Sequence, residues 1–160
     1  MSQDRIIFAG VEFMGESAKI LNPKKRVFMP DMNADCPMAH MADKDEILAL
    51  REKYDDLAVV CYINSTAELK KYSDVCVTSS NAVKIVKNLP NKNIFFIPDR
   101  NLGSYVAKQC PDKNFIFNNG CCPRHVVITK DMVLKAKELR PEARFAAHPE
   151  CTEDVLAFAD

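Results

Sequence analysis

The sequence lacks a long hydrophobic run and an excess of charge of either sign. Its apolar runs fall short of the roughly 18–20 residues that span a bilayer, and its first residues do not follow a signal-peptide pattern. Lys plus Arg and Asp plus Glu both number 22, so the formal net charge is zero. We therefore expect a cytoplasmic protein with no membrane-embedded part and no nucleic-acid partner.

Tryptophan is also absent, and no two cysteines form a compact Cys-x-x-Cys pair. Cysteine itself is abundant: the chain has 7 among 160 residues. In a reducing compartment this indicates buried thiols, metal ligands or redox chemistry rather than a disulfide framework. We expect Cys61 and Cys76, which lie in apolar strand-like runs, to be core residues. Four others lie in polar, turn-rich segments: Cys36, Cys121, Cys122 and Cys151.

Short β-branched and aromatic runs alternate along the chain with helical segments. The expected strands are Ile6–Phe8, Val27–Met29, Leu57–Cys61, Val75–Val77, Ile94–Ile97, Phe115–Phe117 and Arg144–Ala147. The expected helices are Glu12–Leu21, Lys44–Tyr54, Ala67–Tyr72, Ala82–Lys87, Leu102–Lys108, Lys130–Leu139 and Glu153–Phe158, with Asp43 and Thr129 as N-caps of two of them. This order predicts an α/β protein with parallel sheets covered by helices on both faces.

The chain also contains an internal repeat. One constant shift aligns Asp43–Leu48 with Thr129–Leu134 and Cys36-Pro37 with Cys122-Pro123. A nearly equal shift aligns Ile6–Phe8 with Ile94–Phe96. The repeat predicts αβα lobes: the back half of a first lobe over residues 1–35, a complete second lobe over 36–121, and the front half of a third over 122–160. Half-lobes leave sheet edges uncovered, so we expect further sequence at both ends.

Polar segments follow the expected strands, at the edge where parallel sheets bind ligands. The repeat aligns Tyr62-x-Asn64 with His148-x-Glu150, and we expect these groups to meet in one pocket. Each of these polar loops could instead be a turn or a helix cap without a role in ligand binding. The Ser-rich segment before the helix at Ala82 fits both a helix cap and an anion-binding site at a helix N-terminus. Cysteines supplied one per lobe, Cys36 and Cys122 here, could hold a metal cluster, with a third beyond Asp160.

Four blocks resemble quinolinate synthase in family order: Asn33–Ala39, Tyr62–Glu68, Thr78–Ala82 and His148–Cys151. The resemblance covers nearly the whole chain. It implies three αβα lobes in a pseudo-threefold arrangement. It also implies a transferase that condenses iminoaspartate with dihydroxyacetone phosphate to quinolinate in NAD biosynthesis. The family's cofactor is a 4Fe-4S cluster whose open iron acts as a Lewis acid. The resemblance further implies that aspartate oxidase supplies the iminoaspartate.

The resemblance further implies roles for individual residues. Cys36 and Cys122 match two of three cluster ligands, and Tyr62 and Asn64 match residues that hold a substrate carboxylate. Ser79, or its neighbour Ser80, matches a serine that binds a carboxylate or phosphate. His148 and Glu150 match residues at the reacting end of the substrate, with Glu150 as the general base. Tyr62 also belongs to the implied catalytic residues. The family's first-lobe His and Ser and its third cysteine have no counterpart here, which leaves autonomous activity open.

Two other interpretations compete with this one. The chain could be an inactive or incomplete α/β domain that binds a small molecule without a cluster, its cysteines being core residues. It could also be a zinc protein that uses Cys36, Cys121, Cys122 and His125. The absence of a compact cysteine pair disfavours the zinc interpretation.

Overall fold

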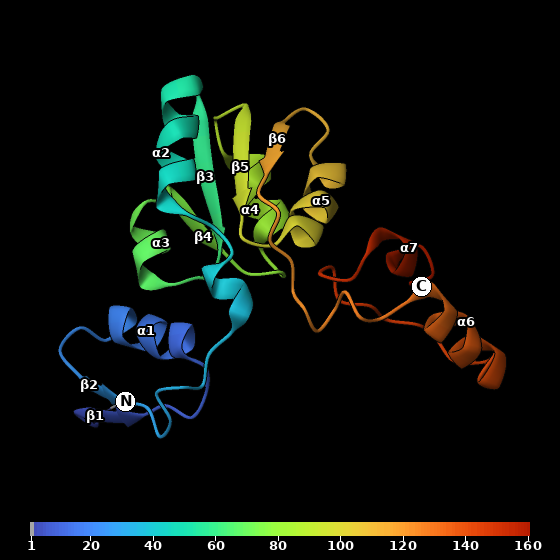
Figure 1. The fold of residues 1–160 in the computed structure, drawn as a ribbon, viewed down its shortest axis with the longest axis horizontal. Coiled ribbons are helices and arrows are strands. Elements are labelled where there is room, and N and C mark those ends of the chain that lie inside the picture. Colours follow the sequence, from blue (N-terminus) through green and yellow to red (C-terminus); the bar gives the residue numbers. More distant parts are fainter. Residues whose placement is uncertain (1) are drawn as a thin grey trace.

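The computed structural model describes residues 2–160, and its central feature is a four-stranded parallel sheet in the order β4-β3-β5-β6 (Figure 1). The strands are β3 (Leu57–Tyr62), β4 (Val75–Val77), β5 (Asn93–Ile97) and β6 (Asn114–Phe117). The connecting helices are α2 (Lys44–Lys53), α3 (Ala67–Lys71), α4 (Ala82–Asn88) and α5 (Arg100–Gln109), preceded by the 3-10 helix η1 (Pro37–His40). All neighbouring strands pair in parallel, as the βα alternation predicted.

The sheet is covered on both faces, which makes this part of the chain a three-layer αβα unit. All six residues of β3 are buried. Its odd-numbered residues pack with Ile47 of α2 and Leu69 of α3, whereas its even-numbered residues pack with Val86 of α4 and Val106 of α5. Side chains alternate along a strand, so only a strand buried on both faces is apolar throughout. The α/β class with parallel sheets is therefore confirmed.

A smaller βαβ unit precedes the sheet. It consists of β1 (Arg5–Ile7), α1 (Glu12–Leu21) and β2 (Arg26–Phe28), and its two strands pair in parallel. Glu16 of α1 accepts a 2.7 Å hydrogen bond from the backbone N–H of Ala67, and Lys70 donates to Ser17 Oγ at 2.9 Å. These bonds attach α1 to α3 of the central unit (Figure 1).

The residues after β6 contain α6 (Lys130–Leu139) and α7 (Glu153–Leu156), but no strand. The predicted strand Arg144–Ala147 is therefore wrong. A strand needs a neighbour for its backbone groups, and no described strand lies beside this segment. Phe145 instead accepts a hydrogen bond from Asp160 N at 2.9 Å and donates to its carboxylate at 2.6 Å. Val133, Cys151 and Val155 form a small separate core.

The predicted caps are confirmed, whereas several element ends shift by one or two residues. Asp43 accepts from Asp45 N and Thr129 accepts from Met132 N, so each caps its helix. Helix α5 begins at Arg100, two residues before the predicted start, and α7 ends at Leu156. No helix of residues 2–160 combines the length and apolar character that crossing a membrane requires.

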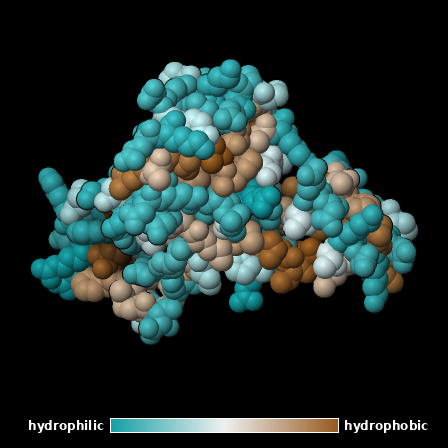
Figure 2. Space-filling model, turned by 45° about the horizontal axis from the view of Figure 1, so that its top comes forward, coloured by the Kyte–Doolittle hydropathy of each residue, from teal (hydrophilic) through white to brown (hydrophobic). Residues whose placement is uncertain are grey.

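Hydrophobic atoms also reach the surface at both ends of the molecule (Figure 2). In the βαβ unit, Ile7 is 78% exposed and Leu21 is 80% exposed, while Phe28 of β2 is about half exposed. In the C-terminal segment, Leu139 and Met132 of α6 are exposed. A two-stranded sheet and a pair of short helices offer too little area to bury such side chains.

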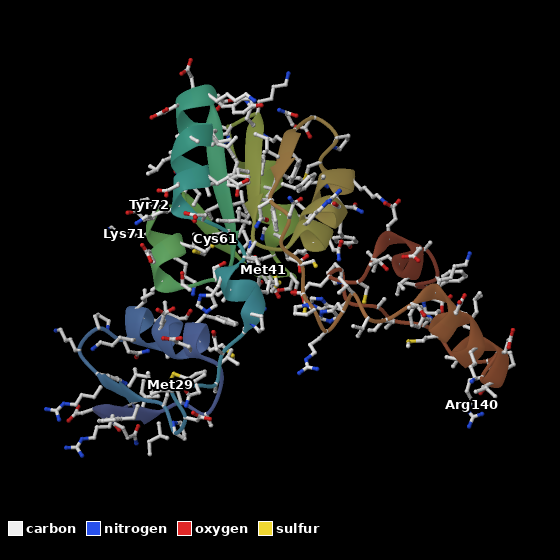
Figure 3. All side chains as sticks on the ribbon, in the orientation of Figure 1. Met29, Met41, Cys61, Lys71, Tyr72 and Arg140 are labelled. Atoms are coloured by element: carbon white, nitrogen blue, oxygen red, sulfur yellow. The ribbon has the colours of Figure 1, made fainter. Side chains whose placement is uncertain are left out.

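The expectation that Cys61 and Cys76 are both core residues is half right. Cys61 is fully buried beneath α3, and Cys76 is its in-register neighbour on β4. Cys76 is nevertheless exposed, because β4 is the edge strand of the sheet. Figure 3 places Cys61 at the α3 side of the sheet. The sequence could not distinguish an edge strand from a central one, since both are short and apolar.

We expect Cys76 to react with iodoacetamide at unusually low pH. A hydrogen bond from Cys61 and the nearby charge of Lys70 lower the pKa of Cys76 from 9.0 to about 7, against the opposing effect of burial. The thiolate is the nucleophile, so alkylation should rise with pH and reach half its maximum near pH 7. Peptide mass spectrometry of samples quenched across the pH range measures this midpoint. In Cys61→Ala the midpoint should move up; an unchanged midpoint would contradict the proposed cause.

Candidate functional site

The site lies where the C-terminal segment meets the carboxyl edge of the central sheet. Tyr62 ends β3, Ser79 follows β4, Asp99 follows β5 and Cys122 follows β6. The turn that contains Glu150 is attached to this edge by Asn101, whose side-chain amide donates a 3.0 Å hydrogen bond to the Glu150 carbonyl. Residues far apart in the sequence are thereby brought to one place, at the edge where parallel α/β sheets bind ligands.

Glu150 is the central charged group of this site. Its side chain is only 3% exposed, although Glu is rarely buried without a partner. His125 Nδ1 lies 2.7 Å from Glu150 Oε2, but outside the direction of a hydrogen bond, and His148 Nδ1 lies 3.9 Å from the same oxygen. The two imidazoles stack, with ring centroids 4.9 Å apart. Among residues 2–160, Glu150 Oε1 and His125 Nδ1 have no hydrogen-bond partner.

Tyr62 faces the same carboxylate. Burial, followed by the hydrogen bond and charge of Glu150, raises the pKa of the Tyr62 phenol well above its ordinary value, while a hydrogen bond with Ser79 opposes the shift. The phenol therefore stays protonated at any physiological pH, with its single O–H directed to Glu150 unless a ligand takes that hydrogen bond. Of the two candidate serines, Ser79 is the one beside Tyr62; the hydroxyl of Ser80 is exposed and bonds Thr78 Oγ1 at 2.9 Å.

Asp99 holds the loop that carries Cys122. Its carboxylate is fully buried and accepts from Leu102 N at 2.7 Å through Oδ1 and from Cys122 N at 2.9 Å through Oδ2. Burial raises the pKa of Asp99 to about 6, with the charge of Glu150 adding to the shift and the backbone hydrogen bonds opposing it. The same side chain thus caps α5 and fixes the position of Cys122.

The two aligned cysteines occupy similar local structures. In both repeats, the Cys-Pro pair begins a turn. Ala39 N donates to Cys36 O at 2.9 Å in one repeat, and His125 N donates to Cys122 O at 3.1 Å in the other. Cys36 is half-buried and packs against the hydrophobic cluster that contains Cys122. Burial is the largest cause that raises the pKa of the Cys122 thiol.

The structure gathers most, but not all, of the residues singled out in the sequence. Tyr62, His148 and Cys122 lie around the buried carboxylate of Glu150, with Ser79 beside Tyr62. A pocket of about 470 Å³ opens next to them, lined by Ser79, Ser80, Val83, Tyr105, Gln109 and Pro149. Asn64 is half-buried on the loop after β3, without a side-chain hydrogen bond among those found in residues 2–160.

Asp99 is the residue that sequence reasoning missed. Asp99 lies in one of the polar segments that follow the strands, and it is the N-cap of α5. An Asp placed directly after a strand and Pro, and before an apolar helical run, is a recognisable capping signal. Its second bond, to Cys122 N, could not be foreseen because the two residues lie on loops after different strands.

Comparisons with known proteins agree with the blocks found in the sequence. A family model described as quinolinate synthetase A protein matches residues 1–160. The chain is 61% identical over 155 residues to the quinolinate synthase of Fusobacterium nucleatum subsp. nucleatum, covering 97% of this chain and 52% of that protein. It is 54% identical over 159 residues to that of Caldicellulosiruptor saccharolyticus (99% and 52%), and 48% identical over 158 residues to that of Clostridioides difficile (99% and 52%). The chain spans about half the length of the curated relatives it matches.

Proposed function

This chain belongs to the quinolinate synthetase A family, and on that premise we propose that it supplies a large part of the active site of a quinolinate synthase. The reaction is the condensation of iminoaspartate with dihydroxyacetone phosphate to quinolinate, with loss of phosphate and water. We place the protein in the cytoplasm, with aspartate oxidase supplying iminoaspartate. The lobe boundaries at residues 36 and 122, and the pseudo-threefold arrangement of a complete enzyme, belong to the same proposal.

One observation carries the proposal: Tyr62, Cys122 and His148 surround the buried carboxylate of Glu150 at the carboxyl edge of the sheet. Tyr62 comes from the central unit and Glu150 from the C-terminal segment, so the site exists only when both have folded. A buried acid with histidines and a protonated phenol beside it is typical of a site for proton transfer on a polar small molecule.

Within this arrangement Glu150 is the general base. Its unpartnered Oε1 is free to accept a proton from substrate, and burial strengthens its interactions with groups nearby. His148 stands at the reacting end beside the same carboxylate, and its Nδ1 accepts a 3.3 Å hydrogen bond from Glu150 N, which orients the turn that carries the base. Tyr62 and Ser79 donate hydrogen bonds to a substrate carboxylate or phosphate, with Asn64 on the adjoining loop adding an amide donor.

Two thiols fit the cluster that the family implies. Cys122 belongs to a large hydrophobic cluster against which Cys36 packs; each opens a turn, and both thiols are free. We assign the third ligand that the family implies to none of the described residues. When bound, a four-iron cluster held by three thiolates supplies one Lewis-acidic iron. The chain's own contribution is to hold the Cys122 thiol beside the Glu150 carboxylate and to supply Cys36 as a second thiolate.

Anaerobic reconstitution with iron and sulfide tests this proposal. The chain should gain a broad absorbance band near ~400 nm together with bound iron, and both should be lost in Cys36→Ala and in Cys122→Ala. Cys110→Ala is the matched control, since Cys110 is a buried thiol at the C-terminal end of α5, opposite the end that Asp99 caps, and should not matter. A folded chain that binds no iron would contradict the cluster assignment and favour a binding domain without a cofactor.

A further inference from the structure

Two cysteines outside the candidate site lie side by side on neighbouring strands, and both are free. Cys61 of β3 and Cys76 of β4 are partners in the parallel register, so their side chains point to the same face of the sheet. Neighbouring strands lie roughly 4.8 Å apart, and a disulfide joins Cα atoms that are roughly 4.4–6.8 Å apart. The backbone therefore holds the two thiols where a bond between them can form while the strands stay paired.

The two thiols differ in exposure and in ionisation. Cys61 is fully buried beneath α3, whereas Cys76 is exposed on the edge strand. The hydrogen bond with Cys76 is the largest cause that raises the pKa of Cys61, and burial adds to it. The same hydrogen bond lowers the pKa of Cys76 to about 7, helped by the charge of Lys70 and opposed by burial. Cys76 is therefore the nucleophile that a dissolved reagent meets, with the protonated thiol of Cys61 behind it.

The positive charge beside Cys76 is fixed in place by α1. Lys70 Nζ donates to Ser17 Oγ at 2.9 Å and lies 5.6 Å from the centroid of the Phe13 ring. Because Lys70 is half-buried, salt screens its charge less than that of an exposed lysine. The contact between α1 and α3 thus places a cation where it favours the thiolate form of Cys76.

The single proton of Cys61 has two acceptors within reach. Cys61 Sγ lies 3.4 Å from the carbonyl oxygen of Tyr62, to which it can donate, and it also hydrogen-bonds Cys76. A charged acceptor forms the stronger bond, so the proton turns to Cys76 once that thiol ionises. Oxidation of Cys61 removes this donor next to Tyr62, a consequence for catalysis that rests on the proposed function.

We propose that Cys76 and Cys61 form a reversible redox site, in which a hydroperoxide oxidises Cys76 and Cys61 then closes a disulfide between β3 and β4. In the first step the Cys76 thiolate attacks the O–O bond and keeps one oxygen as a sulfenic acid. The other oxygen takes up a proton from solvent and leaves as an alcohol or water. In the second step the Cys61 sulfur displaces the sulfenic hydroxyl, which leaves with the Cys61 proton as water. The two thiols lose the two electrons that the peroxide gains, and a dithiol reverses the change by becoming a disulfide itself.

Peroxide treatment followed by peptide mass spectrometry tests this proposal on the chain before any iron is added. Trypsin separates Cys61 and Cys76 into different peptides, neither of which contains another cysteine, by cleavage after Lys53, Lys70, Lys71 and Lys84. Stoichiometric hydrogen peroxide, followed by N-ethylmaleimide to block the remaining thiols, should give these two peptides joined by a disulfide that dithiothreitol breaks. The joined pair should be lost in Cys76→Ser and in Cys61→Ala. Cys110→Ala is the matched control and should form the pair as the parent chain does.

Two further measurements separate the steps. In Cys61→Ala the sulfenic acid of Cys76 has no thiol to displace it, so dimedone should trap it, whereas the parent chain should give little of this adduct. Lys70→Met should slow the oxidation of Cys76 at pH 7 by roughly 3–5-fold, because the thiolate loses a favourable charge. Ser17→Ala removes the hydrogen bond to Lys70 but keeps the charge, and should oxidise at the parent rate.

The outcome is separable from that of the proposed function, because neither Cys61 nor Cys76 is a proposed cluster ligand and the readout is chemical. If Cys61→Ala does not fold, Cys76→Ser remains informative, because it changes an exposed residue on the edge strand. A folded parent chain in which Cys76 is oxidised without joining Cys61, or in which other cysteines pair as readily, would overturn the proposal whether or not a cluster forms.

Discussion

Gly120→Ala should destabilise the protein by about 3 kcal/mol, the cost of forcing extra volume into a tightly packed site. A methyl group at this position would fall on the carbonyl oxygen of Pro98 and lie 2.9 Å from Met41 Cβ and 3.1 Å from Asn118 Nδ2. The nearest obstacle is backbone, which cannot rotate away as a side chain can. Met41 lies on the segment between η1 and α2, beneath the sheet (Figure 3), so the loops after β5 and β6 both meet it here.

Urea unfolding followed by circular dichroism measures this effect, and the thermal midpoint should fall by roughly 6–12 °C. Gly15→Ala is the matched control. Its added methyl would meet only the side chain of Met29, which is flexible, and Ala is the better residue within α1. Figure 3 shows Met29 in the βαβ unit. Equal destabilisation in the two variants would refute the argument from backbone contact.

Asp99→Ala should cost about 2–3 kcal/mol. The substitution removes the cap of α5 and leaves two buried N–H groups, those of Leu102 and Cys122, without an acceptor. A lost cap costs about 1 kcal/mol and a buried unsatisfied donor about 1–3 kcal/mol. Relief of the unfavourable burial that raises the pKa of Asp99 partly offsets these losses.

Two further variants separate the roles of Asp99 in the same unfolding experiment. Asp99→Ser keeps a hydroxyl that can cap α5 but is too short to reach Cys122 N, so it should recover about 1 kcal/mol. Asp43→Ala removes an exposed cap that accepts from only one N–H, and should cost about 1 kcal/mol. If Asp99→Ala costs no more than Asp43→Ala, the bond to Cys122 contributes nothing measurable.

Both substitutions act on the loop that presents Cys122, so a loss of stability there should also disturb metal binding. Arg100 N donates to Gly120 O at 2.8 Å, which ties the start of α5 to this loop directly. The loop is therefore rigid before any ligand arrives. A site assembled from loops after different strands needs such cross-connections, because no secondary structure fixes the loops relative to one another.

Six of the seven predicted strands form, and the exception shows what local pattern cannot decide. Phe145 and its neighbours have the composition of a strand and align with β3 in the repeat, yet they pair with no strand in the described chain. Apolar content indicates that a segment can be buried, whereas pairing depends on a neighbour supplied by the rest of the fold. Cys76 differs from expectation for the same reason: exposure depends on its position at the sheet edge.

The sequence by itself determined the α/β class, the parallel sheets, the helix caps at Asp43 and Thr129, and membership of the quinolinate synthetase A family. These follow from local periodicity, short-range hydrogen bonds and conspicuous blocks of residues. Only the tertiary structure decided that Asp99 holds Cys122 and that Glu150 meets His125 and Tyr62. Contacts between loops of different strands depend on how the layers pack, and no spacing along the chain encodes them.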